Sequence, residues 1–233
     1  TFHDGTPFNA EAVVYNIERS RDMPGSLRRA DLGTITDIIA ADEHTVVFEL
    51  SAPYAPLMAK LSERMGMMIS PTAAESLGQN FATAPVCAGP YRFVERVAQD
   101  RIVLERNPDH WNVDAFPVER AVFRIIPDPS IRLANLQSGE IDILARLAST
   151  DVPQVEADPS LHIQAIDSLG YQSLVINVGH GPRAATPLGS DPLVREALEA
   201  ALDRQAIVTV AFDGQYAAGN QFASPASPYY NRD

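Results

Sequence analysis

Two adjacent arginines, Arg28 and Arg29, are the side chains in this sequence best suited to bind a charged small molecule. Guanidinium groups donate paired, charge-assisted hydrogen bonds to carboxylates, so the two could clamp one end of an acidic or zwitterionic ligand. They follow Pro24, Gly25 and Leu27 in a loop. The alternative is that both arginines are merely solvated, because charged loop residues usually face water.

The sequence lacks the patterns typical of catalysis and of metal binding. Its five histidines never take HExxH or HxxxH spacing, and there is no GxSxG elbow and no GxxxxGK[ST] phosphate loop. Cys87 is the single cysteine, which excludes an internal disulfide and a cysteine cluster for metal. We interpret it as a small buried thiol, since a nucleophile would need a histidine close in space. We therefore expect no enzyme activity, no metal site and no cofactor.

Composition sets further limits on function. The 233 residues are 45% hydrophobic and 21% charged, which is ordinary for a globular protein. A net charge of -12, with Lys60 as the only lysine, argues against nucleic-acid binding, which needs clustered cations. No segment approaches the ~20 consecutive apolar residues of a membrane helix. Because the sequence begins at Thr1 without methionine, we expect a fragment of a longer protein.

A predicted β-hairpin organises the middle of the chain. Its strands are Tyr91–Val97 and Arg101–Arg106, joined by a tight turn at residues 98–100. Gly89 and Pro90 precede it, and Asn107 follows it, as expected of residues that interrupt strands. We expect the chain to pass from one structural body to another at this hairpin.

Before the hairpin, the pattern predicts helices and strands in alternation. Asn9 is expected to cap a helix that ends near Arg21, because its side chain can accept hydrogen bonds from first-turn amides. The other predicted elements are a hairpin over 34–40 and 45–50, short helices over 54–61 and 71–77, and a compact strand over 65–69.

After the hairpin, the pattern predicts a strand over 121–126, a helix capped by Asp128 and ending at Gly139, and a strand over 140–144. Strand, helix and strand in this order indicate a βαβ unit with local parallel pairing. Further predicted elements are a helical turn over 152–157, strands over 161–166 and 171–178, and two helices that begin at Pro192 and Gln205. The first of these two helices is expected to turn Leu193, Val194 and Leu198 inward.

Four stretches in order resemble the family 5 extracellular solute-binding proteins, the receptors of peptide, glutathione and nickel ABC importers. They are FHDGTPFNAEAVVYNIER at 2–19, AGPYRFVERVAQDRIVLERNPDHW at 88–111, SGEIDIL at 138–144 with IIPDPSIRLANLQ ahead of it, and PLVREALEAALDRQAIV at 192–208. One departure lies at the hairpin entrance, where Cys87 and Ala88 stand in place of the family's Gly-Thr before Gly89. A ligand contact made there by glycine backbone is therefore in doubt.

The resemblance implies a mixed α/β fold of the periplasmic-binding-protein type II, in the cluster that carries an extra accessory domain. On this basis residues 1–84 would form the accessory domain beside lobe one. Residues 85–178 would form part of lobe one, and residues 179–233 the start of lobe two. Both lobes would be incomplete in this chain.

The resemblance also implies a function. The chain would belong to the substrate-binding component of an ABC importer, which binds a dipeptide, oligopeptide or glutathione-type solute between its lobes and delivers it to the permease. Nickel is disfavoured, because Gly25, Arg28 and Met67 occupy positions where the nickel-binding branch has arginine and tryptophan. The same fold attached to a transcriptional regulator, where it senses the ligand, is the alternative.

Candidate ligand contacts follow from the same resemblance. The accessory-domain loop contributes Leu27, Arg28 and Arg29, and other loops expected to border the cleft contribute Met67, Asn177 and Phe222. The full-length protein is expected to be a periplasmic or extracytoplasmic monomer, with a lipid anchor as a further option. Its expected partners are the small peptide-like solute and the transmembrane subunits of the permease, and no nucleic acid.

Overall fold

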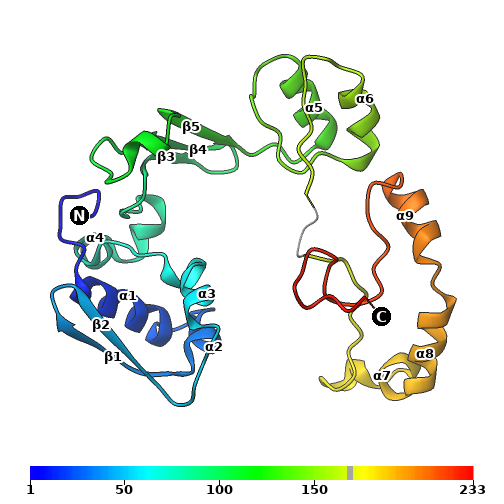
Figure 1. Cartoon of the computed structure of the whole chain (residues 1–233), viewed down its shortest axis with the longest axis horizontal. Coiled ribbons are helices and arrows are strands. Elements are labelled where there is room, and N and C mark those ends of the chain that lie inside the picture. Colours follow the sequence, from blue (N-terminus) through cyan, green and yellow to red (C-terminus); the bar gives the residue numbers. More distant parts are fainter. Residues whose placement is uncertain (167–169, 233) are drawn as a thin grey trace. The chain divides into compact units, whose positions relative to one another are not determined.

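The computed structural model describes residues 1–166 and 170–232, in a mixed α/β fold (Figure 1). The chain divides into two compact units, Thr1–Ile125 and Ile126–Asp233. The boundary falls inside the segment 85–178 that we assigned to lobe one, so the assignment of segments to lobes stays a prediction. The expected segments 85–178 and 179–233 also include residues 167–169 and 233, which lie outside the described residues.

The first unit begins with α1 (Ala10–Asp22), which packs on the hairpin of β1 (Ile35–Asp42) and β2 (Thr45–Leu50). The expected cap is confirmed, because the side chain of Asn9 accepts a hydrogen bond from the amide of Ala12 at 3.0 Å. The two strands pair antiparallel, with Ile38 opposite Phe48. Helix and hairpin therefore form two layers.

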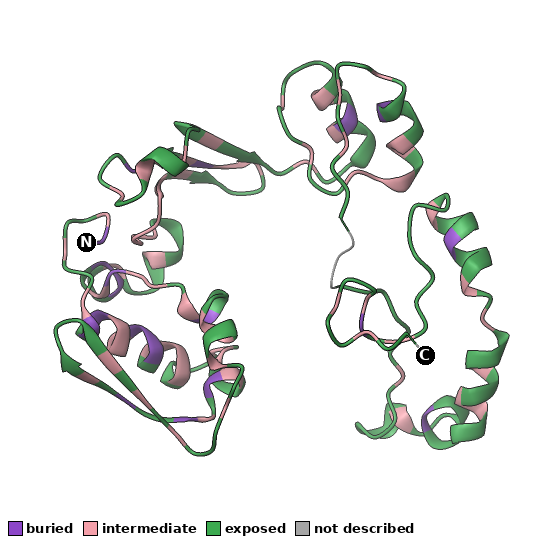
Figure 2. Ribbon diagram, in the orientation of Figure 1, coloured by how far each residue is buried: buried purple, intermediate pink, exposed green. Residues whose placement is uncertain are grey.

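The core of the first unit lies between these layers. Ile17 is 0% exposed, and Leu32, Ile35, Ile38 and Met65 are buried around it. The buried residues in Figure 2 include several on α1 and two along β1, Ile35 and Ile38. Burial of apolar surface contributes about 25 cal/mol per Å² removed from water, so this cluster stabilises the packing of α1 on the hairpin.

The first unit also contains the short helices α2 (Arg29–Leu32), α3 (Leu57–Leu61) and α4 (Pro71–Leu77), and a 3-10 helix at Arg64–Gly66. A second 3-10 helix, Gly78–Thr83, follows α4. The strand predicted over 65–69 is wrong: this stretch begins in a 3-10 turn, and only Ile69 pairs in an isolated bridge, with Cys87. Its run of methionines is apolar enough for a strand, but Met65 packs into the core from a turn.

The predicted central hairpin is confirmed with its bounds, as β3 (Tyr91–Val97) and β4 (Arg101–Arg106). A third antiparallel strand, β5 (Arg120–Arg124), pairs with β4 and completes a sheet in the order β3-β4-β5. The register shifts between Phe93 and Glu95, which leaves Val94 as an extra residue in β3. Before β5, a 3-10 turn covers Val113–Ala115.

Asp4 connects the first loop to the start of α4. It accepts hydrogen bonds from the Ser70 hydroxyl at 2.5 Å and from the Thr6 hydroxyl at 2.6 Å. Ser70 is itself 0% exposed, and its hydroxyl also caps α4 by accepting from Ala73 N at 3.1 Å. Burial alone would raise the pKa of Asp4, but the hydrogen bonds from Ser70 and Thr6 outweigh it and lower this pKa below 3.8.

We expect Asp4→Asn to lower stability at pH 7 by about 1 kcal/mol, because the charged acceptor of two hydroxyls is lost. A depressed folded-state pKa stabilises the protein above the usual carboxyl pKa, and this contribution disappears as pH falls through the folded value. The difference between wild type and variant should therefore be present at pH 7 and shrink toward pH 3. Urea unfolding of the full-length protein at pH 7 and at pH 3 measures this difference in stability, with Asp114→Asn as the exposed control. A constant difference would contradict the assignment.

The regular elements described in the second unit are all helices. Asp128 caps α5 (Pro129–Gln137), as predicted, by accepting a hydrogen bond from Ile131 N at 3.0 Å. After it come α6 (Val152–Glu156), α7 (Pro187–Ser190), α8 (Pro192–Ala201) and α9 (Arg204–Phe212). Two further 3-10 turns cover Ser149–Asp151 and Pro182–Ala184.

Three predicted strands in the second unit are wrong. Residues 140–144, 161–166 and 171–178 form no paired strand, and the strand pairs of the described residues are all antiparallel, so the βαβ prediction fails too. A strand is stabilised by ladder hydrogen bonds, and these stretches have no ladder partner within the described part of the chain. Their sequences carry strand propensity, but Ile143 is 85% exposed and Val175 91% exposed.

The inward face predicted for α8 is also wrong. No residue of α8 is buried, and Leu193 is 70% exposed, whereas Val194 and Leu198 are half-buried. On the same helix Arg195 donates to Leu188 O at 2.9 Å, and Glu199 pairs with Arg204. Among residues 1–166 and 170–232, no helix combines the length and apolar character that crossing a membrane requires.

Candidate functional site

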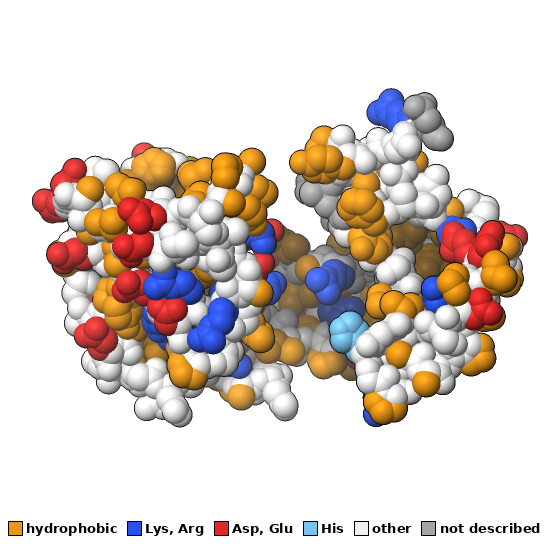
Figure 3. Space-filling view, turned by 90° about the horizontal axis from the view of Figure 1, so that it is seen from below, with side chains coloured by type: hydrophobic (Ala, Val, Ile, Leu, Met, Phe, Trp, Pro, Cys, Tyr) orange, Lys and Arg blue, Asp and Glu red, His pale blue; other side chains and the backbone are white. Residues whose placement is uncertain are grey.

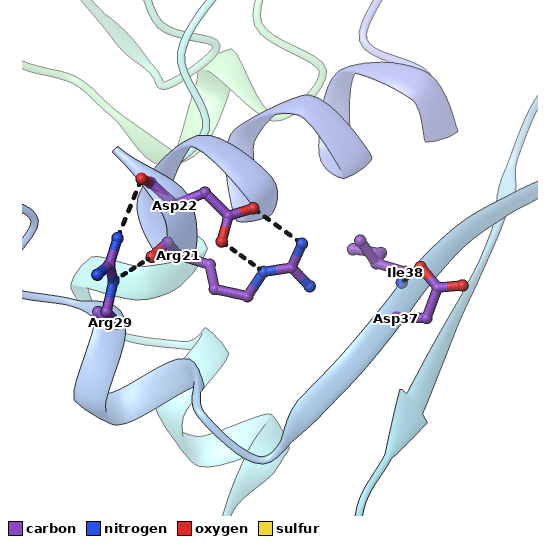
Figure 4. A network of polar contacts seen from close by, with 5 residues as sticks. All are labelled: Arg21, Asp22, Arg29, Asp37 and Ile38. Atoms are coloured by element: carbon purple, nitrogen blue, oxygen red, sulfur yellow. Dashed lines mark hydrogen bonds and ion pairs between the residues drawn. The ribbon is translucent and has the colours of Figure 1, made fainter. Parts of the chain in front are cut away.

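The two adjacent arginines do different things in the structure. Arg29 donates from Nε to Arg21 O at 3.0 Å and from Nη2 to Asp22 O at 3.1 Å, and so binds the last carbonyls of α1 (Figure 4). A cation at a helix C-terminus satisfies carbonyls that have no partner within the helix and complements the helix dipole. The side chain of Arg29 is therefore held against α1, and Arg28 is the arginine of this pair that reaches a surface depression.

Further contacts fix the loop between α1 and α2. The hydroxyl of Ser26 donates to Ser20 O and accepts from the backbone amide of Arg28 at 3.2 Å. Gly25 takes a positive φ of 77°, which favours glycine in this tight turn. Leu27 stands out from the loop and is 85% exposed. The loop thus presents Leu27 and Arg28 while Arg29 and Ser26 anchor it to α1.

The depression beside Arg28 has a volume of about 280 Å³ and is lined by charged side chains of the first unit. It is bordered by Arg28 and Asp31 from the α2 segment, by Ala59 and Lys60 of α3, and by Glu63, Arg64 and Met65. Acidic and basic side chains lie next to one another on the face of this unit shown at the left of Figure 3. Such a surface suits a polar, charged ligand.

Two of the residues that line this depression, Asp31 and Lys60, form an ion pair. Lys60 Nζ donates to Asp31 Oδ1 at 2.5 Å, with both side chains about one third exposed. The hydrogen bond from Lys60 lowers the pKa of the Asp31 carboxyl, and the same bond raises the pKa of Lys60. Both groups are therefore charged at neutral pH and compensate each other. Sequence reasoning missed this pair, because residues 31 and 60 are distant in the chain and share no motif.

Met67 lies on a segment that forms hydrogen bonds to two other parts of the first unit, through Ile69 and Ser70. It is 69% exposed, while the buried side chain of Asn16 accepts from Ile69 N at 2.9 Å and donates to Ile69 O at 2.9 Å. Asn16 also donates to Ala12 O at 2.8 Å, and Ser70 N donates to Val86 O at 2.9 Å. The backbone around Met67 is thus fixed to α1 and to the entrance of the β3 hairpin.

The two candidates of the second unit lie on surface loops. Asn177 accepts from His180 N at 2.9 Å and donates from Nδ2 to His180 O at 3.0 Å, which folds the Gly-rich turn. Phe222 is 73% exposed. The first unit therefore contains Leu27, Arg28, Arg29 and Met67, and the second contains Asn177 and Phe222; their roles as ligand contacts stay predictions.

A second depression, of about 320 Å³, contains Cys87 together with His3, Tyr91, Phe93 and Arg96. Burial raises the pKa of the Cys87 thiol above 9.0, so the thiol is protonated at neutral pH. His3 lies in the same depression, but its Nε2 is within 2.8 Å of Gly89 O. This arrangement favours the structural interpretation of Cys87 over a nucleophilic one. Within the described part of the chain, no group of three or more potential metal ligands occurs.

Comparison with known proteins identifies the family. The profile of the bacterial extracellular solute-binding proteins, family 5 middle, matches residues 1–233. The chain belongs to family 5 of these proteins. One relative is the glutathione-binding protein GsiB of Pectobacterium atrosepticum, 30% identical over 226 residues, which are 97% of this chain and 41% of that protein. The GsiB of Shigella flexneri is also 30% identical, over 98% of this chain and 44% of its own length.

Solved structures agree with this family assignment. The periplasmic binding protein AgaA of A. tumefaciens R10, in complex with agropinic acid, has a TM-score of 0.79 and 27% identity; the match covers 92% of this chain and 42% of AgaA. DppA of Helicobacter pylori, in complex with the peptide STSA, has a TM-score of 0.76 and 27% identity over 90% of this chain and 43% of DppA. The fold is that of periplasmic binding proteins, and the chain spans about two fifths of these relatives' length.

Proposed function

We propose that the full-length protein containing this chain is the substrate-binding component of an ABC importer. It binds a dipeptide, an oligopeptide or a glutathione-type solute in a cleft between two lobes and delivers it to the permease. Family 5 membership supports the transport role. The names of the relatives, a glutathione-binding protein and a structure with a bound peptide, support the class of solute.

The assignment of this function to the chain rests on the position of Arg28. Its side chain borders a charged depression, and no hydrogen bond or ion pair engages its guanidinium within the described residues. A free peptide always ends in a carboxylate, which a guanidinium binds with charge-assisted hydrogen bonds. Leu27 beside it offers exposed apolar surface for an adjoining side chain of the ligand.

The remaining candidates complete the proposed site. Arg29 acts by positioning the loop against α1, since its guanidinium already binds two carbonyls there. Met67 supplies an adaptable apolar contact, and Asn177 and Phe222 contribute from the second unit. The protein binds its solute without converting it, as a periplasmic or extracytoplasmic monomer, with a lipid anchor as a further option.

Binding to the full-length protein tests this function. Titration calorimetry and thermal shifts with glutathione, the dipeptide Met-Leu and the tetrapeptide STSA should show saturable binding and stabilisation for at least one of them. Arg28→Ala should weaken that binding about tenfold, the loss expected for one charge-assisted contact at a partly exposed site.

Arg120→Ala is the matched control, because Arg120 lies on β5 and its partner is Glu105 of the same sheet. It should leave affinity unchanged. Absence of saturable binding for all three solutes would overturn the proposed solute class. Equal affinity of wild type and Arg28→Ala would instead remove Arg28 from the site and leave the solute class intact.

A further inference from the structure

The charged side chains around the Arg28 depression differ in whether each forms an ion pair with a side chain of opposite charge. Three cations and two acids line it: Arg28, Lys60, Arg64, Asp31 and Glu63. Lys60 and Asp31 neutralise each other at 2.5 Å. A ligand carboxylate gains little from a lysine that is already paired, because it would compete with Asp31 for the same ammonium.

The other two cations are available to a ligand. The guanidinium groups of Arg28 and Arg64 border the same depression, and among the described residues neither forms an ion pair or a side-chain hydrogen bond, although the charge of Arg28 also acts on the Asp31 carboxyl. Arg64 lies in the 3-10 helix directly before Met67, and Arg28 follows the exposed Leu27. Two cations from segments distant in the chain thus line one depression, a role that was expected of the adjacent pair Arg28 and Arg29.

We infer that Arg28 and Arg64 together form a subsite for the carboxylate of the solute. The Asp31–Lys60 ion pair, whose charges cancel, borders this subsite. This inference rests on the proposed function. It adds a second cation to the site and specifies that the carboxylate end of the solute binds there. The arginine that completes the clamp is Arg64, since Arg29 is engaged by α1.

Glu63 allows a test in which binding of the carboxylate should become stronger, not weaker. Its carboxylate borders the same depression and is exposed. At a separation of several ångströms from a bound carboxylate, it repels that group weakly through water. Removing its charge should therefore strengthen binding, whereas removing either arginine should weaken it.

The experiment compares a carboxylate with its amide in the full-length protein. Met-Leu and its C-terminal amide serve as probes in titration calorimetry. Arg64→Ala should weaken Met-Leu binding about fivefold and leave the amide nearly unchanged, and Glu63→Gln should strengthen Met-Leu binding about twofold. Arg120→Ala should alter neither probe. An equal loss for acid and amide with Arg64→Ala would overturn the inference.

A second measurement decides the inference even if no peptide binds. Phenylglyoxal modifies accessible guanidinium groups, and peptide mass mapping follows each arginine separately. N-acetylalanine should slow modification of Arg28 and Arg64 together, whereas N-acetylalaninamide should not, and Arg120 should react equally with both. If the carboxylate protects neither arginine, the subsite is wrong. If it protects both while wild type binds no peptide, the subsite stands and the proposed solute class fails.

Discussion

Replacing Asn16 with alanine should destabilise the first unit by about 3 kcal/mol, since two backbone groups of Ile69 lose their partner. Asn16 is 5% exposed, and its amide makes both hydrogen bonds to Ile69 and one to Ala12 O. Alanine is too short to replace any of them. The segment that carries Met67 would lose its link to α1.

Urea unfolding of the full-length protein, combined with hydrogen exchange of the Ile69 amide, measures this effect. The Ile69 amide should exchange much faster in the variant than in wild type. Asn80→Ala is the control, because Asn80 is exposed in the 3-10 helix after α4, and its backbone carbonyl accepts the hydrogen bond of the Thr83 hydroxyl. A loss of stability below about 0.5 kcal/mol, the range of ordinary surface substitutions, would contradict the importance given to Asn16.

Replacing Gly66 with alanine should cost about 3 kcal/mol, because the added carbon has no room. A Cβ at this position would lie 1.7 Å from the carbonyl oxygen of Leu61 and 2.8 Å from its carbon. These are backbone atoms at the end of α3, so they cannot move aside as a flexible side chain would. The 3-10 helix that carries Arg64 and Met65 would have to shift.

Thermal or urea unfolding of the full-length protein reports this cost. Gly33→Ala is the matched control, since a Cβ there would make ordinary contacts at 3.6 Å and 3.7 Å, and its φ of -63° suits any residue. That change should alter stability by no more than about 1 kcal/mol. Equal stability of the two variants would show that the α3 turn relaxes without strain. The same Gly66→Ala protein should also show weaker carboxylate binding, because Arg64 moves with its helix.

Local signals in the sequence predicted much of the fold. The caps at Asn9 and Asp128 were predicted because a capping side chain bonds an amide three residues away. The strands of the hairpin 91–106 were predicted because breakers bound them and a short turn joins them. Where the partner lies nearby in sequence, the residues themselves specify it.

Predictions that depended on distant partners failed in several places. The stretches 140–144, 161–166 and 171–178 have the composition of strands, but composition supplies no ladder partner. The face of α8 has helical spacing, but no described element covers Leu193. Burial and pairing are properties of two surfaces, and the sequence of one surface does not determine the other.

The candidate site divides in the same way. The sequence by itself determined the family, the helices with their caps, and Arg28 as a candidate in an exposed loop. Only the tertiary structure decided that Arg29 binds the end of α1, that Lys60 is neutralised by Asp31, and that Arg64 borders the depression beside Arg28. The physical reason is range: capping and turn formation act within a few residues, whereas electrostatic pairing depends on distances that the folded chain sets.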